Sequence, residues 1–329
     1  MQISPVEELF TVFNETALII QEELEYSYLE ALALTGENIF QEAILQEELS
    51  ELNKKRLKKL YESVNLSKYS KEELRKSFQL VILKGMKENT QPNHQMTPDT
   101  IGMFIGYLVQ KFNTATHFRL IDLAVGTANL LTTVMNHQPD KQISAYGVDV
   151  DDLLLQLAYV NANMQEQPIE FFNQDSLEHL FIDPADIIVS DLPVGYYPND
   201  IRANDYQLKA DTGHSYAHHL FIEQSINYLK EGGYAFFVIP NNLFETEQAP
   251  KLHAYFKETV HIQGILQLPS TLFVNKQSAK SILILQKRGN DIKAPKQVLL
   301  ANVPSFSNMK AMEKVLGELE TWIKENKND

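Results

Sequence analysis

Acidic and small residues follow four apolar runs in the middle of the chain, and their spacing suits the binding of a nucleotide-like ligand. The first run, 120–123, has the character of a buried strand and is followed by Val125, Gly126 and Thr127. An apolar helix is predicted directly afterwards, over 128–135. A strand, a glycine loop and a helix N-terminus in succession offer backbone N–H groups to a ligand. A single glycine fits a tight packing turn equally well.

The second run, 143–149, is again a predicted strand and ends at Asp149. A carboxylate at the tip of the second strand of such a fold suits a paired hydrogen bond to a ribose diol. The alternative is that Asp149 only caps the next helix, which Asp151 and Asp152 open. Because the glycine loop lies upstream, we favour ribose binding.

The third and fourth runs carry residues that would face a base and a reacting group. Run 169–176 ends at Asp175 and Ser176, whose side chains can contact a base edge. The fourth, 186–197 (DIIVSDLPVGYY), is a predicted buried strand followed by an acid, a proline and paired tyrosines.

Taken in this order, the four units resemble the class I S-adenosylmethionine-dependent methyltransferases, in particular the amino-methylating group with a DxAxGTGNLL loop and an (N/D/S)PP(Y/F) motif. They are most similar to the YtxK-type adenine-specific DNA methylases, which are related to modification subunits of type I restriction systems. The resemblance extends over 96–288 and includes 96–99 (MTPD), where such methylases contact the methionine end of the cofactor. Ala128 replaces the second loop glycine, and Leu192 and Val194 replace a proline and the stacking aromatic.

The resemblance implies S-adenosylmethionine as the cofactor, lying across the carboxyl ends of the first three strands. The loop would approach its methionine part, Asp149 its ribose, and Asp175 its adenine ring. The full set of cofactor-binding residues implied in this way is Thr97, Asp122, Ala124, Gly126, Thr127, Asn129, Asp149, Val150, Asp175, Ser176 and Asp191.

The same resemblance implies a catalytic set of Asp191, Leu192, Pro193, Tyr196 and Tyr197. Asp191 and the Leu192 carbonyl would accept the two hydrogens of an acceptor amine and turn its lone pair toward the methyl group. A base taken from a duplex must be flipped out and normally stacks on an aromatic ring. Val194 cannot stack well, so Tyr196 or Tyr197 would take the stacking role. An equally good alternative is that both tyrosines only anchor the loop.

Composition excludes several other chemistries. The chain has 329 residues, of which 44% are hydrophobic and 22% charged, as in an ordinary globular protein. It has no cysteine, which excludes disulfides, thiolate metal sites and the covalent cysteine expected for methylation at cytosine C5. The nine histidines have no metal-binding spacing, so no metal is expected. No membrane span or signal segment is recognised, and we expect a cytoplasmic protein.

These features predict an N-methyltransferase acting on the N6 amine of adenine in DNA. The net charge of −14 argues against strong nonspecific adhesion to nucleic acid, although a local basic face remains compatible with it. One alternative is methylation of a protein glutamine amide, because those enzymes carry a similar asparagine–proline–proline motif. Another is a non-catalytic protein that binds S-adenosylmethionine and acts through its N-terminal part.

Two domains are predicted to position these residues. Residues 1–90 show helical periodicity without strand signals, and form a helical N-terminal domain in which Gly36 is expected to separate two helices. Its basic cluster at 54–59 is more typical of a solvated helix face than of a nucleic-acid contact, but this module is also the expected site for a protein partner. Residues 91–329 form the methyltransferase domain, after a linker at 88–98.

The expected fold of the second domain is a Rossmann-like α/β sheet of the class I methyltransferase type. The strand signals over 120–286 predict seven strands, mostly parallel, with one antiparallel strand near the C-terminal end. An amphipathic helix is expected over 309–323.

Overall fold

The computed structural model describes residues 4–88, 96–275 and 277–326. The predicted domain boundary between residues 90 and 91 lies outside the described residues, as does most of the predicted linker. The N-terminal module is helical, as expected, and contains α1 (Pro5–Leu24), α2 (Tyr28–Phe40), α3 (Glu51–Tyr61), a 3₁₀ turn (Leu66–Lys68) and α4 (Lys71–Glu88). Ser4 with Glu7 and Ser27 with Glu30 form capping boxes that fix the starts of α1 and α2.

The expectation that Gly36 separates two helices is wrong, because Gly36 lies inside α2. A Cβ on Gly36 would come within 2.2 Å of Cγ1 of Val160, so the missing side chain lets α2 press against a helix of the second domain. Gly85, inside α4, is similarly close to Tyr28 and Leu29. Both glycines therefore serve close helix packing.

The second domain contains one sheet of eight strands in the order β3-β2-β1-β4-β5-β7-β6-β8. The strands are β1 (His117–Asp122), β2 (Gln142–Asp149), β3 (Ile169–Asn173), β4 (Ala185–Asp191), β5 (Leu229–Pro240), β6 (Val260–Gln267), β7 (Lys280–Lys287) and β8 (Leu299–Asn302). Only β7 runs against its neighbours in this described sheet, as predicted. The prediction of seven strands is corrected to eight, because β8 adds a short parallel edge strand beside β6.

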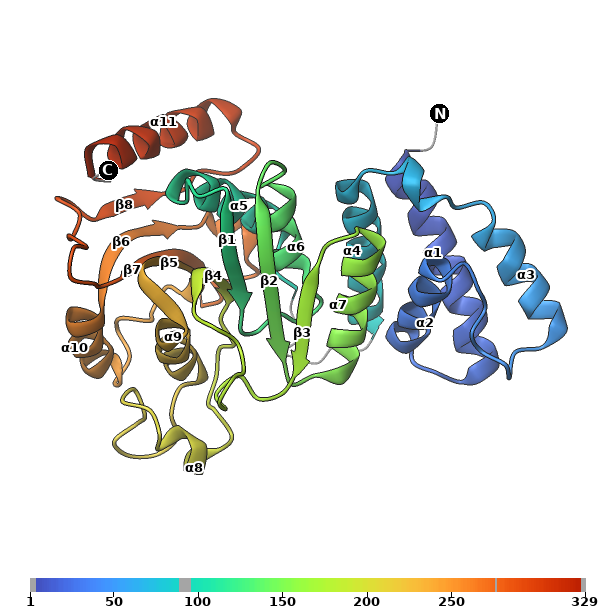
Figure 1. The fold of residues 1–329 in the computed structure, drawn as a ribbon, viewed down its shortest axis with the longest axis horizontal. Helices are drawn as coiled ribbons and strands as arrows, with labels where there is room; N and C mark the ends of the chain where they lie inside the picture. Colours follow the sequence, from blue (N-terminus) through green and yellow to red (C-terminus); the bar gives the residue numbers. More distant parts are fainter. Residues whose placement is uncertain (1–3, 89–95, 276, 327–329) are drawn as a thin grey trace.

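Helices cover both faces of the sheet (Figure 1). One face packs against α5 (Asp99–Phe112), α6 (Asn129–Asn136) and α11 (Met309–Asn326). The other packs against α9 (Ala217–Asn227), α10 (Ala249–Thr259) and the segment that carries the short helix α8 (Asp200–Ala203). Helix α7 (Asp152–Met164) lies between β2 and β3 in the chain and packs against both the sheet and the N-terminal module.

Helix α7 contributes side chains to the hydrophobic cores of both domains. Leu155, Ala158 and Ala162 of this helix pack against the sheet core. Leu157, Val160 and Met164 pack into the core of the helical module. Figure 1 shows α4 and α7 side by side at the β3 end of the sheet. Helix α7 therefore joins the two domains through an apolar interface.

Among the described residues, no helix is both long and apolar enough to cross a bilayer. The same part of the chain contains no group of three or more histidine and acidic side chains arranged to hold a metal ion.

Candidate functional site

The predicted site residues gather at the carboxyl ends of neighbouring strands. Asp122 ends β1, Asp149 ends β2 and Asp191 ends β4, while Asp175 follows β3 by two residues. Strand β1 pairs with β2 on one side and β4 on the other, so the strand order reverses there. Ligands of open α/β sheets bind at such a reversal.

The glycine loop is shaped by Gly126 and Asp149. Gly126 has a φ of 51°, and a Cβ on it would meet no described atom within 4 Å. The Asp149 carboxylate accepts hydrogen bonds from the Gly126 N–H (2.8 Å) and the Asp151 N–H (3.1 Å). Burial raises the pKa of Asp149, although these two hydrogen bonds oppose the shift. Each carboxylate oxygen keeps lone-pair capacity for a ribose hydroxyl. Helix α7 is capped instead by Asp151, whose side chain accepts a hydrogen bond from the Leu154 N–H (2.9 Å), so the alternative that Asp149 only caps this helix is wrong.

Asp122 stabilises the glycine loop through hydrogen bonds from a buried position. Its side chain is 1% exposed and accepts hydrogen bonds from the Ala124 N–H (3.0 Å) and the Ser190 hydroxyl (2.9 Å). Burial raises its pKa to about 7, against the effect of these hydrogen bonds. Thr127 is also buried, and its carbonyl accepts a hydrogen bond from Asn161 (3.2 Å). These contacts fix the shape of the loop.

The residues expected at the adenine ring divide into exposed and buried ones. Val150 is 66% exposed directly beside Asp149, as an apolar surface for a ring requires. Ser176 is buried and donates its hydroxyl hydrogen bond to the Leu123 carbonyl (2.5 Å). The Asp175 carboxylate accepts a hydrogen bond from the Tyr197 hydroxyl. Ser176 and Tyr197 therefore act as supports, and Tyr197 has the character of a loop anchor.

Asp191 lies where a methyl acceptor is expected, and both of its oxygens are engaged. The Lys280 ammonium lies 2.6 Å from Oδ1, and the Thr97 hydroxyl donates to Oδ2 at 3.0 Å. The side chains of Asp191 and Lys280 are 16% and 22% exposed. Sequence reasoning missed Lys280, because an isolated lysine at the start of β7 belongs to no motif. Its position beside Asp191 becomes visible only once β7 is known to pair with β5, which pairs with β4.

The segment after Asp191 presents both buried and exposed side chains. Leu192 is buried and donates its backbone N–H to the Val238 carbonyl (3.2 Å), while Pro193 is half-buried. Val194 is 52% and Tyr196 60% exposed. Tyr196 stacks on Tyr216, with ring centroids 5.1 Å apart and an angle of 9° between planes. A bridge between these two residues holds the stack in place.

Two buried histidines lie behind this stack at the start of α9. The ring of His218 lies 5.1 Å from that of Tyr216 and 4.9 Å from that of His219. Both histidines are buried, and their ring nitrogens have no hydrogen-bond partner among the described residues. Burial lowers the pKa of His218 to about 4 and, together with the charge of His218, that of His219 to about 3. The pair is neutral at pH 7, and both rings lie against Tyr216.

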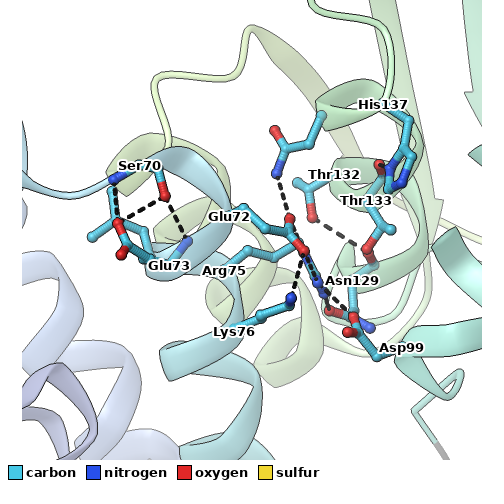
Figure 2. A network of polar contacts seen from close by, with 12 residues as sticks. Ser70, Glu72, Glu73, Arg75, Lys76, Asp99, Asn129, Thr132, Thr133 and His137 are labelled. Atoms are coloured by element: carbon cyan, nitrogen blue, oxygen red, sulfur yellow. Dashed lines mark hydrogen bonds and ion pairs between the residues drawn. The ribbon is translucent and has the colours of Figure 1, made fainter. Parts of the chain in front are cut away.

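Asn129 is the first residue of α6 and connects the loop to the helical module. Its side-chain oxygen accepts a hydrogen bond from Arg75 of α4 (2.8 Å), and its side-chain nitrogen donates to the Thr97 carbonyl (3.3 Å). Figure 2 shows Arg75 pointing from α4 toward Asn129 and Asp99. Sequence reasoning missed Arg75, because 54 residues separate it from Asn129.

Two family descriptions match this chain and together cover most of it. Residues 7–86 match the YtxK N-terminal helical domain, and residues 82–322 match the N-6 DNA methylase family. The chain belongs to the N-6 DNA methylase family. Its nearly full length is also similar to the YtxK protein of Bacillus subtilis (strain 168), with 51% identity over 99% of this chain and 100% of the relative.

Solved structures agree with this family. A candidate class I S-adenosylmethionine-dependent methyltransferase from Listeria monocytogenes is 48% identical and superimposes with a TM-score of 0.91, covering 97% of this chain and 98% of the other. A modification subunit of a candidate type I restriction enzyme from Vibrio vulnificus YJ016 shares the fold at 14% identity, with a TM-score of 0.68 over 89% of this chain and 65% of the other.

The cofactor of this N-6 DNA methylase fold is S-adenosylmethionine, and the residues present fit it. Within the described chain, Ala128 precedes α6 at a φ of 59° and provides no side-chain cap, which leaves the helix N-terminus to an anionic group. The open space at Gly126, the carboxylate of Asp149 and the exposed Val150 suit its methionine, ribose and adenine parts in turn.

Proposed function

We propose that this N-6 DNA methylase transfers the methyl group of S-adenosylmethionine to the exocyclic N6 amine of adenine in DNA. The observation that carries the proposal is the Asp191 carboxylate at the end of β4, held by Lys280 and Thr97 beside Leu192 and Pro193. An exocyclic amine needs a hydrogen-bond acceptor at this point, and no cysteine is required. The family to which the chain belongs supports adenine as the acceptor base.

The bound cofactor supplies an electrophilic methyl group on a positively charged sulfur. Transfer to the acceptor would form a nitrogen–carbon bond as the carbon–sulfur bond broke, with that electron pair left on sulfur. The amine nitrogen then loses one proton to solvent, which balances the transfer. Asp191 and the Leu192 carbonyl accept the two amine hydrogens and orient the lone pair. Most of the rate gain therefore comes from positioning.

The exposed ring of Tyr196 is the stacking surface that we propose for the flipped base. It lies two residues beyond Val194, and its stack on Tyr216 holds it rigid. Tyr197 is unsuited to this role, because it is buried and its hydroxyl is used by Asp175.

Base stacking on an aromatic ring contributes about 1–3 kcal/mol. Tyr196→Ala should thus raise KM for DNA by about 10-fold, while Tyr196→Phe keeps the wild-type value.

Methyl transfer from isotope-labelled S-adenosylmethionine tests the function directly. The full-length protein is incubated with genomic DNA that lacks adenine methylation, with RNA and with bulk protein. We expect label in N6-methyladenine of DNA, identified by mass spectrometry of nucleosides, and none with Asp191→Ala. Label in protein glutamine would establish the amide alternative. Absence of transfer to all three by a protein that binds the cofactor would overturn catalysis and favour a non-catalytic role.

A further inference from the structure

We propose that Arg75 of the helical module is a positioning residue of the cofactor site. Its side chain is 0% exposed although it is charged, and it lies on α4 rather than on any cofactor motif. Burying a guanidinium is costly unless its donors are paired. Glu72 (2.6 Å) and Asp99 (2.5 Å) provide the opposite charges. Through Asn129, Arg75 then fixes both the start of α6, which follows the glycine loop, and the segment that contains Thr97.

The contact with Asn129 goes beyond charge pairing. Nη2 of Arg75 donates hydrogen bonds to the carboxylates of Glu72 and Asp99, and Nε donates a second one to Glu72. Nη1 donates to the neutral side-chain oxygen of Asn129 at 2.8 Å. The planar guanidinium fork allows these directions to be served at the same time. A lysine has no comparable fork, so the geometry at Asn129 depends on arginine.

Asn129 passes this constraint on to the reacting end of the site. Because its oxygen is taken by Arg75, its nitrogen faces the Thr97 carbonyl, to which it donates at 3.3 Å. The Thr97 hydroxyl in turn donates to Asp191. A path of polar contacts thus runs from α4 through the first residue of α6 and Thr97 to the Asp191 carboxylate.

Helix α4 holds α6 at its other end as well. Glu72 accepts a hydrogen bond from Asn136, the last residue of α6, at 3.2 Å. Figure 2 shows Glu72 and Arg75 side by side between the two helices. The helix whose N-terminus faces the cofactor is therefore clamped at its first and last residues by one helix of the N-terminal module. This module is part of the cofactor site rather than a separate attachment.

Calorimetric titration of the full-length protein with S-adenosylmethionine tests the proposal without any methyl acceptor. Arg75→Met removes the donors and should weaken cofactor binding by about 10-fold or more per folded molecule. Arg75→Lys keeps the charge opposite Asp99 and should fold, but should still bind several-fold more weakly. The matched control is Lys71→Met, which breaks another contact from α4 to the second domain, the bond to the Glu166 carbonyl (3.2 Å). Its affinity should match wild type.

A double-mutant cycle separates positioning from general destabilisation. If Arg75 acts through Asn129, the Arg75→Lys, Asn129→Ala double variant should bind S-adenosylmethionine at most about two-fold more weakly than Asn129→Ala alone. Folded Arg75→Lys and Arg75→Met variants with wild-type affinity would overturn the proposal, and so would fully multiplicative losses in the cycle. Since only cofactor binding is measured, failure here leaves adenine methylation as a separate question.

Discussion

The Asp191 carboxylate stands at the first position of the segment that resembles the (N/D/S)PP(Y/F) motif, where that motif also allows the neutral amide of asparagine. Lys280 compensates the charge of this carboxylate at 2.6 Å, in a pair that is mostly buried. An unpaired charge in such surroundings costs several kcal/mol, whereas a well-made pair keeps its oxygens fixed. We infer that Asp191 and Lys280 together replace one asparagine, and that Lys280 preserves the acceptor geometry of Asp191.

This pairing predicts a compensating effect of two substitutions. Asp191→Asn alone leaves Lys280 without its partner, and Lys280→Met alone leaves Asp191 uncompensated, so each should lower kcat by about 10-fold or more. The double variant removes one positive and one negative charge and should recover to within a few-fold of wild type. Turnover per cofactor-bound molecule is the measurement. Losses that simply multiply in the double variant would show that the pair does not act as a unit.

His219 predicts a pH dependence of stability. Its pKa in the folded protein is about 3, lowered by burial and by His218, against about 6.5 in an unfolded chain. Between pH 6 and pH 4 the unfolded state therefore binds more protons, and stability falls as pH falls. His219→Phe should remove up to about 1.4 kcal/mol per pH unit from this slope. Urea unfolding at several pH values measures it, with the exposed His253→Gln as control. An unchanged slope in His219→Phe would contradict the assignment.

At the scale of elements, the strands of the site were predictable because each combines an apolar run with an acidic residue at its end or, for β3, two residues beyond it. The edge strand β8 was not, because it has only four residues of alternating half-buried and exposed character. Gly36 was misjudged because a glycine inside a helix suggests a break until a partner helix is known to pack on it. Lys280 and Arg75 were missed because their roles depend on contacts between residues far apart in the chain.

Replacing glycine by alanine inside a helix should have opposite effects at Gly36, where α2 packs on α7, and at Gly317, where space is open. Gly36→Ala places a Cβ 2.2 Å from Val160, and overpacking costs about 1–3 kcal/mol, more than the helix propensity of alanine returns. Gly317, inside α11, has no described atom within 4 Å of the position that an added methyl group would take, so Gly317→Ala should stabilise by up to about 1 kcal/mol. Urea denaturation measures both. Val160→Ala should relieve part of the Gly36→Ala penalty; an unchanged penalty would place the strain elsewhere.

For the whole molecule, the helical module has two candidate uses. Its basic cluster lies on α3, where Lys54 donates to the Glu47 carbonyl (3.0 Å) and Lys58 pairs with Glu62 (3.9 Å). These local partners favour the solvated-face interpretation over a nucleic-acid contact. The interface with α7 and the contact of Arg75 with Asn129 give the module an internal role instead. We therefore expect that removing residues 1–90 exposes Leu157, Val160 and Met164 and impairs cofactor binding.

An interface of this kind predicts that the module and the sheet unfold together. The single tryptophan, Trp322, lies on α11 against Phe112 and reports on the sheet domain. Because the chain has no cysteine, a Leu52→Cys variant can carry one dye on α3, where Leu52 is 70% exposed. Urea titrations followed by the two probes should give the same midpoint and slope. S-adenosylmethionine at about 100 times its Kd should raise the midpoints reported by the two probes by the same amount, equivalent to about 2.7 kcal/mol of unfolding free energy. A module that unfolds at lower urea, or that ignores the cofactor, would mean that the α7 interface and the Arg75 contact do not couple the two domains.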